Sequence, residues 1–384
     1  MMDFSITEEQ RAILDSVDRM MAAHLPPDQV REYDGRGECP PGLLRRFGEL
    51  GILGIPFPER FGGLGGDWLT VTLVVERLGY HAAIAASLYS ITVDFGGMSL
   101  LTYGSDAQRA ALLPPLIQGE MQFSLALSEP GAGTDAAALV TRAERTAAGW
   151  RINGRKTWIS SADTAAYLVT VCRTERGSTG NAGVSILLVP PTTPGVHMTR
   201  LHKLGNNSLT SWDIAFEDVE VPADALMGEE GNGFRHVMST LQFSRSGQAA
   251  NAMGQAQAAV DLAVAHAKDR VQFGRPLTQF QVLRHKLVDM QARVDQARLI
   301  LYRLAWLMAT GQPCRREAAQ AKVLASETLQ AVASDGMQIL ASSGYAAESP
   351  MNRILRDSRL YTFGEGANEM LRDQIARAMG LVPR

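Results

Sequence analysis

An acidic residue between two glycines stands near the end of the chain and is the first candidate for chemistry. The segment Phe363-Gly364-Glu365-Gly366-Ala367-Asn368-Glu369-Met370 contains it. Glycine carries no side chain, so Glu365 is poorly shielded by its neighbours and another molecule can approach it closely. A carboxylate acts as a general base at neutral pH once its surroundings raise its pKa. A solvated glutamate in a loop before a last helix is the ordinary alternative.

A glycine-containing loop is the second candidate, with the sequence Ser128-Glu129-Pro130-Gly131-Ala132-Gly133-Thr134-Asp135. The proline and the two glycines predict a turn. Glycines also let backbone N–H groups approach an anion or a flat ring closely. Ser128 and Thr134 add hydroxyl groups that can bond to heteroatoms. A plain connecting loop explains the same residues equally well.

Two further segments carry weaker signals. Lys156-Thr157-Trp158-Ile159-Ser160-Ser161 places a tryptophan on a predicted strand, where it is more often a core residue than a platform for a cofactor. Asp269-Arg270-Val271-Gln272-Phe273-Gly274-Arg275-Pro276 lies between two predicted helices. Its two arginines can clamp phosphates, although a basic surface loop is a serious competing interpretation.

These segments need elements to position them, and the elements change character twice along the chain. Residues 1–120 are predicted to be helical, with capping-box spacing from Thr7 to Gln10 and an apolar, buried helix from Ala82 to Tyr103. Residues 121–230 contain short β-branched and aromatic runs, and Asn153-Gly154 predicts a tight turn. Residues 231–384 are helical again. This order favours an α+β fold with segregated regions.

The clearest helix is predicted from Lys286 to Met308. Its apolar positions recur at alternating spacings of three and four residues: Leu287, Met290, Val294, Ala297, Leu301, Leu304 and Met308. Gly311 and Pro313 are expected to end the helix. Such a seam suits a four-helix bundle and suits packing between subunits equally well.

Composition excludes several classes of protein. The 384 residues carry a net charge of −3, so no nucleic-acid partner is expected. Cys39, Cys172 and Cys314 are far apart and lack metal-site spacing, which favours three unpaired thiols in a reducing compartment and no metal. No signal peptide and no membrane span is evident, so a cytoplasmic location is expected. The motifs GxGxxG, GxxxxGK[ST], GxSxG and HExxH are absent, which leaves a Rossmann, kinase or hydrolase interpretation without support.

The candidate segments occur together and in order on this α–β–α chain, and the combination resembles the acyl-CoA dehydrogenase family over essentially the whole length. The matching stretches are Ala126 to Asp135, Arg270 to Gln281, and the segment from Arg356 to Glu369 that ends in GEGANE. The resemblance implies an N-terminal helical domain (1–120), a central β domain (121–230) and a C-terminal four-helix bundle (231–384). It also implies one FAD per subunit and a homotetramer, or a homodimer.

Site residues follow from the resemblance position by position. Glu365 stands at the place of the catalytic base, and Arg245 matches an arginine near the substrate thioester, with Ser244 and Gln242 beside it. The flavin contacts implied within the subunit are Leu127, Ser128, Gly133, Thr134, Trp158 and Ser160. Contacts to the FAD of a neighbouring subunit are implied for Arg270, Phe273, Gln281 and Gln338.

The implied reaction is α,β-dehydrogenation of an acyl-CoA, with α-proton abstraction by Glu365 and β-hydride transfer to flavin N5. Electrons would leave to an electron-transfer flavoprotein or to oxygen. In some family members the base directly precedes the helix arginine, but that residue is Ser244 here and cannot serve, which strengthens Glu365. Removal of the carboxylate is expected to keep FAD and lose most turnover.

Several positions depart from the family pattern. Gln242-Phe243-Ser244 replaces an Asp-Gly-Gly run, and Ala341-Ser342 replaces two glycines. Ala367 replaces a threonine, and Asn207 replaces an arginine. These departures favour a specialised substrate. One alternative is therefore a dehydrogenase, oxidase or monooxygenase of the same fold that acts on a carrier-protein-bound or specialised thioester in secondary metabolism. A flavin-free scaffold on the same fold is a further alternative, against which the retained Glu365 and Trp158 argue.

Overall fold

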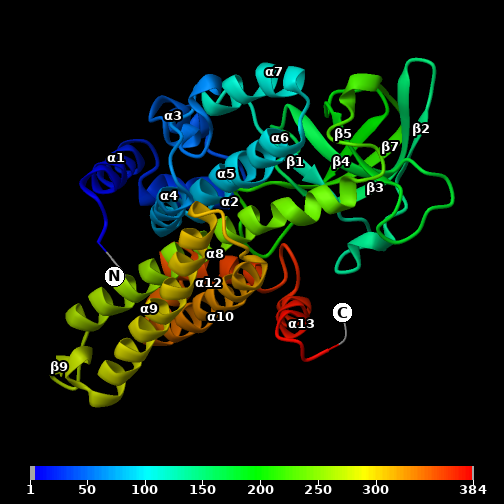
Figure 1. Ribbon diagram of the computed structural model, residues 1–384. Helices are drawn as coiled ribbons and strands as arrows, with labels where there is room; N and C mark the ends of the chain where they lie inside the picture. Colours follow the sequence, from blue (N-terminus) through cyan, green and yellow to red (C-terminus); the bar gives the residue numbers. More distant parts are fainter. Residues whose placement is uncertain (1–4, 383–384) are drawn as a thin grey trace.

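The computed structural model describes residues 5–382, which form a helical region, a β region and a second helical region along the chain (Figure 1). The N-terminal helices are α1 (Glu8–His24), α2 (Pro27–Arg36), α3 (Leu43–Glu49), α4 (Trp68–His81), α5 (Ala83–Ser90), α6 (Met98–Tyr103) and α7 (Asp106–Ile117). The predicted capping box is confirmed, because Thr7 and Gln10 each accept from the other's backbone N–H. Such reciprocal bonds satisfy two of the amide groups that every helix start leaves unpaired.

The predicted buried helix from Ala82 to Tyr103 forms as α5 and α6, joined by a π-helical segment, η3 (Ile91–Gly97). The extra residue per turn in a π segment changes which side chains face a neighbour, and such segments are frequent at functional sites. By length and composition, Ala83–Tyr103 could cross a membrane. However, 72% of its apolar window is buried inside the protein, as in the core helix of a folded domain.

The β region is a seven-stranded sheet in the order β1-β4-β2-β3-β7-β6, with β5 also paired to β4. Its strands are β1 (Phe123–Ala126), β2 (Arg142–Arg145), β3 (Gly149–Ser160), β4 (Tyr167–Arg173), β5 (Val184–Val189), β6 (Val196–Arg200) and β7 (Ser211–Pro222). Most pairs are antiparallel, while β1 and β2 pair with β4 in parallel. A separate apolar core lies within this sheet region and includes the fully buried Trp150.

The predicted turn at Asn153-Gly154 is wrong. Both residues lie inside strand β3, where the register with β7 shifts between Ile152 and Gly154. The Asn153 side chain exchanges hydrogen bonds with Asp218 on β7, and Gly154 adopts φ +152° where a Cβ would lie 2.4 Å from Thr141 Oγ1. The dipeptide therefore lies within a strand, opposite a β-bulge on β7 and with close backbone approach at Gly154, and does not reverse the chain.

The C-terminal helices are α8 (Gly233–Asp269), α9 (Gln281–Ala309), α10 (Arg315–Leu340), α11 (Ser342–Tyr345), α12 (Pro350–Ser358) and α13 (Asn368–Ala378). The helix predicted from Lys286 to Met308 is confirmed within α9, and its seam is buried from Leu287 to Leu304. Helices α8, α9 and α10 pack against one another, and α12 and α13 pack against α10. The seam therefore fills the chain's own bundle.

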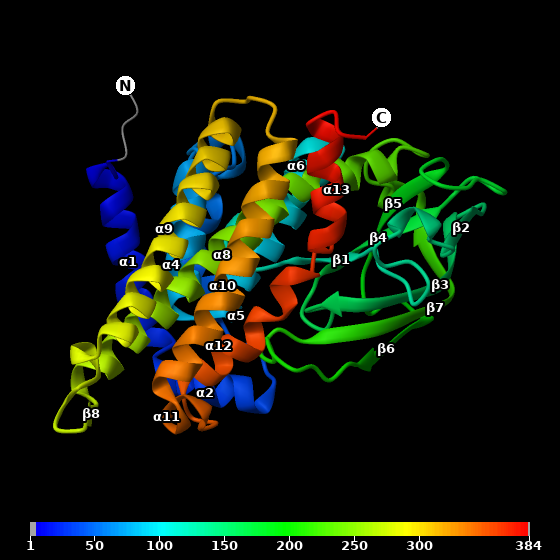
Figure 2. The same ribbon diagram turned by 90° about the horizontal axis from the view of Figure 1, so that it is seen from below.

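The long helix α8 links the two ends of the molecule. It starts beside the sheet and ends at a small hairpin of β8 (Val271–Gln272) and β9 (Arg275–Pro276), which projects at the opposite end (Figures 1 and 2). The chain then returns through α9 and α10. The turn that carries Glu365 follows η7 (Leu360–Thr362) and precedes α13, beside the middle of the molecule.

Candidate active site

The turn around Glu365 is held by two basic side chains from the helices of the C-terminal region. Arg245 on α8 donates from Nε to the backbone oxygen of Glu365 at 3.4 Å. Lys322 on α10 donates from Nζ to the backbone oxygen of Gly366 at 2.7 Å and to Asn368 Oδ1 at 2.9 Å. Glu365 itself has φ +55°, a conformation that non-glycine residues rarely adopt and that clusters at functional sites.

Burial raises the pKa of the Glu365 carboxyl group above its usual 4.5, and a hydrogen bond from Ser244 and the charges of Arg245 and Lys322 oppose that rise. More than a third of the residue is nevertheless exposed to solvent. Both observations fit a carboxyl group that has many protein atoms nearby and is still reached by water. A base in this position keeps raised basicity and remains accessible to a substrate.

The two cations around this turn are themselves perturbed. Desolvation lowers the pKa of Lys322 to about 8, although Glu365 opposes the shift. Desolvation also lowers the pKa of Arg245, again against the influence of Glu365. Lys322 had no predicted role in the sequence. The sequence did contain a sign of this role: Lys322 falls in the apolar stripe of Ala318, Ala325 and Leu329 on α10. A lysine in such a stripe is buried and needs a polar partner.

A buried ion pair holds the glycine-containing loop in place. Lys156 Nζ lies 2.8 Å from Glu129 Oε1 and 2.9 Å from the backbone oxygen of Leu127, and the side chains of Lys156 and Glu129 are 0% and 3% exposed. Glu129 also accepts from the backbone N–H groups of Val140 and Thr141 at 2.7 and 3.0 Å. These bonds fix the loop, while Gly133 and Thr134 stay exposed and Ser128 is half-buried.

Trp158 is 59% exposed, contrary to the usual place of a tryptophan in a core. It has φ +60°, and the register between β3 and β7 shifts between Lys156 and Ile159. This second bulge turns the indole out of the sheet. The Thr157 backbone N–H donates to the Ser128 backbone oxygen at 2.9 Å, which places the indole beside the glycine-containing loop.

The loop and the tryptophan together fit a flat, anionic cofactor such as FAD. No neighbouring atom lies within 4 Å of the Cβ position of Gly131 or Gly133, so the backbone there is open to close approach. An exposed aromatic face beside such a loop suits stacking against a heteroaromatic ring. Leu127, Ser128, Gly133, Thr134, Trp158 and Ser160 lie at this one corner of the sheet and are the residues that would hold the group.

Contacts through the molecule connect this corner to Glu365. Ser124 on β1 donates from Oγ to the Ser160 backbone oxygen at 2.6 Å. A Cβ on Gly96 of η3 would lie 2.8 Å from Phe123 Cβ on the same strand. Asp94, also on η3, is near enough to Glu365 for the Glu365 charge to raise its pKa. The π segment therefore lies between this corner of the sheet and the Glu365 carboxylate.

Four of the predicted cofactor residues lie elsewhere in this chain. Arg270, Phe273 and Gln281 are exposed at the projecting end of α8 and α9, with Phe273 94% exposed. Gln338 is exposed near the C-terminal end of α10. Both views place the hairpin at the opposite end from β3, which carries Trp158 (Figures 1 and 2). One FAD cannot touch both sets within one chain.

A recess opens near the N-terminal end of α8. Its cavity volume is about 320 Å³, and it is lined by Asn181, Gly231, Asn232, Phe234, Arg235, Met238 and Arg315. The predicted substrate residues follow on the same helix: Gln242 is half-buried and accepts from Cys314 Sγ at 3.6 Å, while Ser244 and Arg245 are buried. The volume falls in the range of small-molecule sites.

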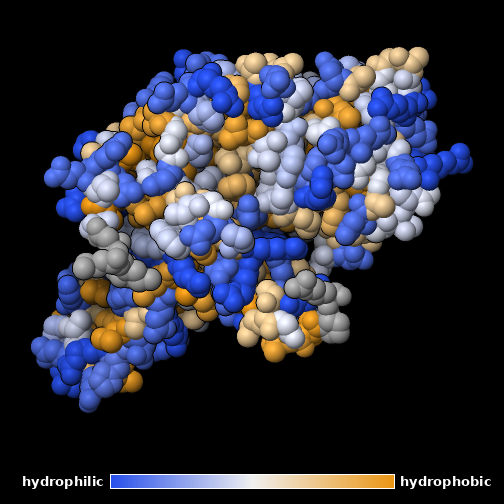
Figure 3. Space-filling model, viewed as in Figure 1, coloured by the Kyte–Doolittle hydropathy of each residue, from blue (hydrophilic) through white to orange (hydrophobic). Residues whose placement is uncertain are grey.

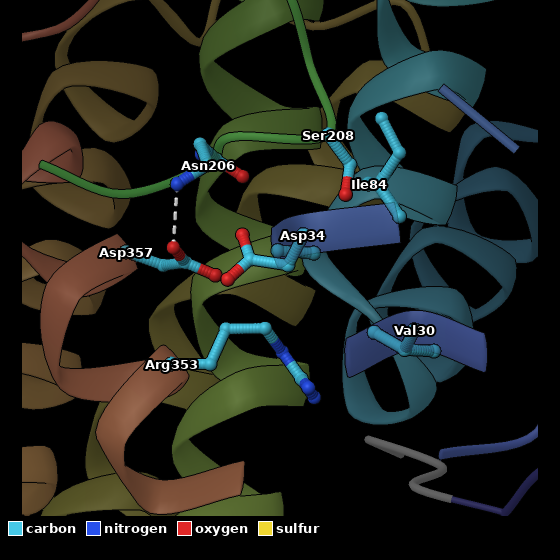
Figure 4. Close-up of a pocket in the computed structure, with 8 residues that line it drawn as sticks. Val30, Asp34, Ile84, Asn206, Ser208, Arg353 and Asp357 are labelled. Carbon is cyan, nitrogen blue, oxygen red and sulfur yellow. Dashed lines mark hydrogen bonds between the residues drawn. The ribbon is translucent and has the colours of Figure 1, made fainter. Parts of the chain in front are cut away.

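A second, smaller cavity lies between α2, the β6–β7 connection and α12. Figure 4 shows the carboxylates of Asp34 and Asp357 facing each other there, above Arg353. The backbone N–H of Asn206 donates to Asp357 at 2.5 Å, and burial raises the pKa of Asp357 to about 6. The volume of this cavity, about 10 Å³, suits one water molecule. This cluster joins the two helical regions to the sheet and does not form a ligand site.

Comparisons with known proteins agree with this geometry. Sequence models of three domains match the chain: "Acyl-CoA dehydrogenase, N-terminal domain" over residues 7–120, "middle domain" over 124–219 and "C-terminal domain" over 231–380. A probable acyl-CoA dehydrogenase, YngJ, of Bacillus subtilis is 37% identical over 98% of this chain and 100% of the relative. The human mitochondrial short-chain specific acyl-CoA dehydrogenase is 38% identical over 88% of this chain and 82% of the relative.

The fold also matches a solved structure. Butyryl-CoA dehydrogenase from Megasphaera elsdenii superposes with a TM-score of 0.94 at 35% identity, over 98% of this chain and 100% of that one. The likeness spans all three regions, so the helical, β and helical order described above is the architecture of that enzyme as well.

Proposed function

Because the chain belongs to the acyl-CoA dehydrogenase family, we propose that Glu365 is the base that removes the α-proton of an acyl-CoA thioester. The protein is an oxidoreductase that acts on CH–CH bonds and depends on FAD. When bound, FAD supplies the acceptor for the β-hydride at flavin N5. The single observation that carries the role of Glu365 is a carboxyl group that solvent reaches and whose pKa is raised by the protein atoms around it.

The surroundings of Glu365 suit proton abstraction. An α-proton of a thioester is weakly acidic, so the base needs more basicity than a carboxylate in water has. Burial supplies that basicity, while Ser244, Arg245 and Lys322 limit the rise in the pKa of Glu365. The backbone N–H of Glu365 makes no hydrogen bond within residues 5–382. It is therefore available to the thioester oxygen as negative charge develops there.

Coenzyme A is supported as the carrier by the recess at the start of α8. Arg235 and Arg315 line it, and guanidinium groups pair well with phosphates. From there α8 leads past Gln242 to Ser244 and Arg245, which adjoin Glu365. A pantetheine arm that follows this face would bring its thioester to the carboxylate.

We further propose that the working enzyme is an oligomer in which the projecting hairpin of one chain contacts the FAD of another. Phe273, Val282, Val288 and Trp306 present exposed apolar side chains on this end and along α9. Apolar patches are visible there among polar residues (Figure 3). Light scattering is expected to give four times the 41.6 kDa chain mass for the FAD-loaded protein. Phe273→Asp is expected to weaken assembly and FAD binding together, and a monomer with full FAD affinity would contradict this proposal.

The catalytic proposal is tested by anaerobic flavin bleaching with butyryl-CoA. Glu365→Gln is expected to bind FAD normally and to slow bleaching by roughly 10²–10⁴-fold, the usual contribution of a general base. Glu369→Gln is the matched control, because Glu369 is an exposed carboxylate four residues away on α13. Near-normal bleaching in Glu365→Gln would exclude Glu365 as the base. Slow reoxidation of the bleached enzyme in air would support an electron-transfer flavoprotein as acceptor, and rapid peroxide formation would support oxygen.

A further inference from the structure

A second carboxyl group lies near Glu365 and has no evident structural purpose. Asp94, in the π segment η3, is 0% exposed. Neither of its carboxyl oxygens has a hydrogen-bond partner with proper geometry among residues 5–382, and the Ser90 hydroxyl beside it has none either. Burying an unpaired carboxyl group costs stability. An apolar residue would pack this helix more stably, so the acid requires another explanation.

Helix α8 is shaped to receive this carboxyl group. A Cβ on Gly247 would lie 1.8 Å from Asp94 Oδ2 and 2.5 Å from Ser90 Oγ, so the acid occupies the space of the missing side chain. Ser244, which bonds to Glu365, precedes Gly247 by three residues on the same face of α8. Three residues correspond to about 4.5 Å along a helix. The two carboxyl groups therefore follow one another along one helix face.

The unpaired atoms around Asp94 are mainly hydrogen-bond acceptors. They are both Asp94 oxygens and the Ser90 hydroxyl, and on α8 the side-chain oxygen of Gln248, next to Gly247, is likewise buried without a partner among residues 5–382. The Gln248 side chain also reaches the Glu365 turn, because a Cβ on Gly364 would lie 3.1 Å from Gln248 Nε2. The Ser90 hydroxyl can donate only one proton. One Ser90 proton cannot pair both Asp94 oxygens and Gln248 Oε1, so a ligand group that donates a hydrogen bond would find an acceptor here.

We propose that Asp94 is a specificity-determining residue that accepts a hydrogen bond from a hydroxyl or amino group on the acyl chain, beyond the carbons that react. The substrate class is thus an acyl-CoA with a polar donor near its distal end. This inference rests on the proposed function, since the acyl chain must pass Glu365 to reach Asp94. The departures Gln242-Phe243-Ser244 on the same helix agree with a substrate other than a plain fatty acyl group.

The electrostatic surroundings of Asp94 are consistent with a hydrogen-bond donor on the ligand. Burial, with the nearby Glu365 charge, raises the pKa of Asp94 well above its usual value, and the Ser90 hydroxyl opposes this. Burial therefore favours the neutral form of this acid over its ionised form. A hydroxyl group can donate to its carbonyl oxygen, and an ammonium group would favour its ionised form.

The test measures the affinity of the FAD-loaded enzyme for 2-enoyl-CoA esters whose acyl chains have four to six carbons, by calorimetry. These esters have no saturated Cα–Cβ bond to oxidise, so affinity is measured apart from turnover. Each chain length is compared without a substituent, with a terminal hydroxyl and with a terminal amino group. For at least one length, the wild type is expected to bind a substituted ester about tenfold more tightly than the plain one.

Asp94→Leu is expected to abolish that preference, and Asp94→Ala serves if leucine disturbs folding. Thr92→Val is the control, because Thr92 is buried on the same segment but its hydroxyl already donates to the Leu88 backbone oxygen. Preference of the wild type for the plain ester at every length, or an unchanged preference in both Asp94 variants, would overturn the inference. Failure of the saturated esters to bleach the flavin would count against the proposed function and leave the binding comparison valid.

Discussion

The buried ion pair of Lys156 and Glu129 leads to a specific prediction about what stabilises the glycine-containing loop. Lys156→Met would leave the Glu129 carboxylate almost fully buried, with its backbone partners Val140 and Thr141 but without its counter-ion at 2.8 Å. Removing one partner of a buried pair typically costs about 3–5 kcal/mol, because the remaining charge is uncompensated. Ser128 and Leu127 share this scaffold, so FAD affinity is expected to fall as well.

The assay is urea unfolding of the FAD-loaded protein, with release of FAD followed by its fluorescence. The double variant Lys156→Met/Glu129→Gln removes both charges and keeps the amide oxygen that Val140 and Thr141 can bond. It is expected to recover most of the lost free energy of unfolding. Exposed Arg151→Met, which breaks a surface pair with Glu220, should leave the free energy of unfolding almost unchanged, because water screens such a pair. A Lys156→Met variant as stable as wild type, with unchanged FAD affinity, would refute the reasoning.

Three further outcomes follow from the site. Trp158→Ala should weaken FAD binding about tenfold with little loss of stability, because the indole is exposed. Trp150→Ala should instead cost about 3–5 kcal/mol of unfolding free energy, because Trp150 is buried. Equal loss of FAD affinity in the two variants, measured by fluorescence titration, would contradict this. Gly247→Ala should destabilise by about 1–3 kcal/mol through its clash with Asp94, and Asp94→Ala should relieve part of that cost in a double-mutant cycle of urea midpoints. Folding raises the pKa of Glu365, so the contribution of this group to the free energy of unfolding is fully present below pH 4.5 and is lost as the pH rises through the raised pKa. Glu365→Gln should therefore gain stability relative to wild type from pH 5 to 8. A difference in thermal unfolding between the two proteins that stays constant over this pH range would argue against the pKa shift.

Local patterns in the sequence predicted the conformation of several candidate segments. The glycines around Glu365 and in the Ser128–Asp135 loop predicted open turns, and both segments are turns in the structure. The seam of α9 and the Thr7 capping box were readable because helix periodicity and end signals depend on neighbouring residues. The β8–β9 hairpin contains the segment predicted to lie between two helices.

Features that depend on contacts between segments distant in the sequence could not be predicted from local patterns. The Asn153-Gly154 dipeptide carries the signal of a turn, but β7 pairs with β3 on both sides of Asn153 and bulges opposite it, which keeps the dipeptide in a strand. Trp158 is turned outward by a register shift that only its partner strand determines. Lys322 and Asp94 gain their importance from α13 and α8, which approach them from elsewhere in the chain. The domain boundaries at 120 and 230, the site roles and the cytoplasmic location stay predictions.

The most direct test of Glu365 as the base is exchange of the α-proton itself. A thioester of CoA with sulfur in place of its β-carbon keeps acidic α-protons but has no β-hydride to lose. Incubated in deuterated water with the FAD-loaded wild type, it is expected to exchange its α-protons, as followed by NMR, at least 10²-fold faster than with Glu365→Gln. Equal exchange rates in the two proteins would show that another group removes the proton.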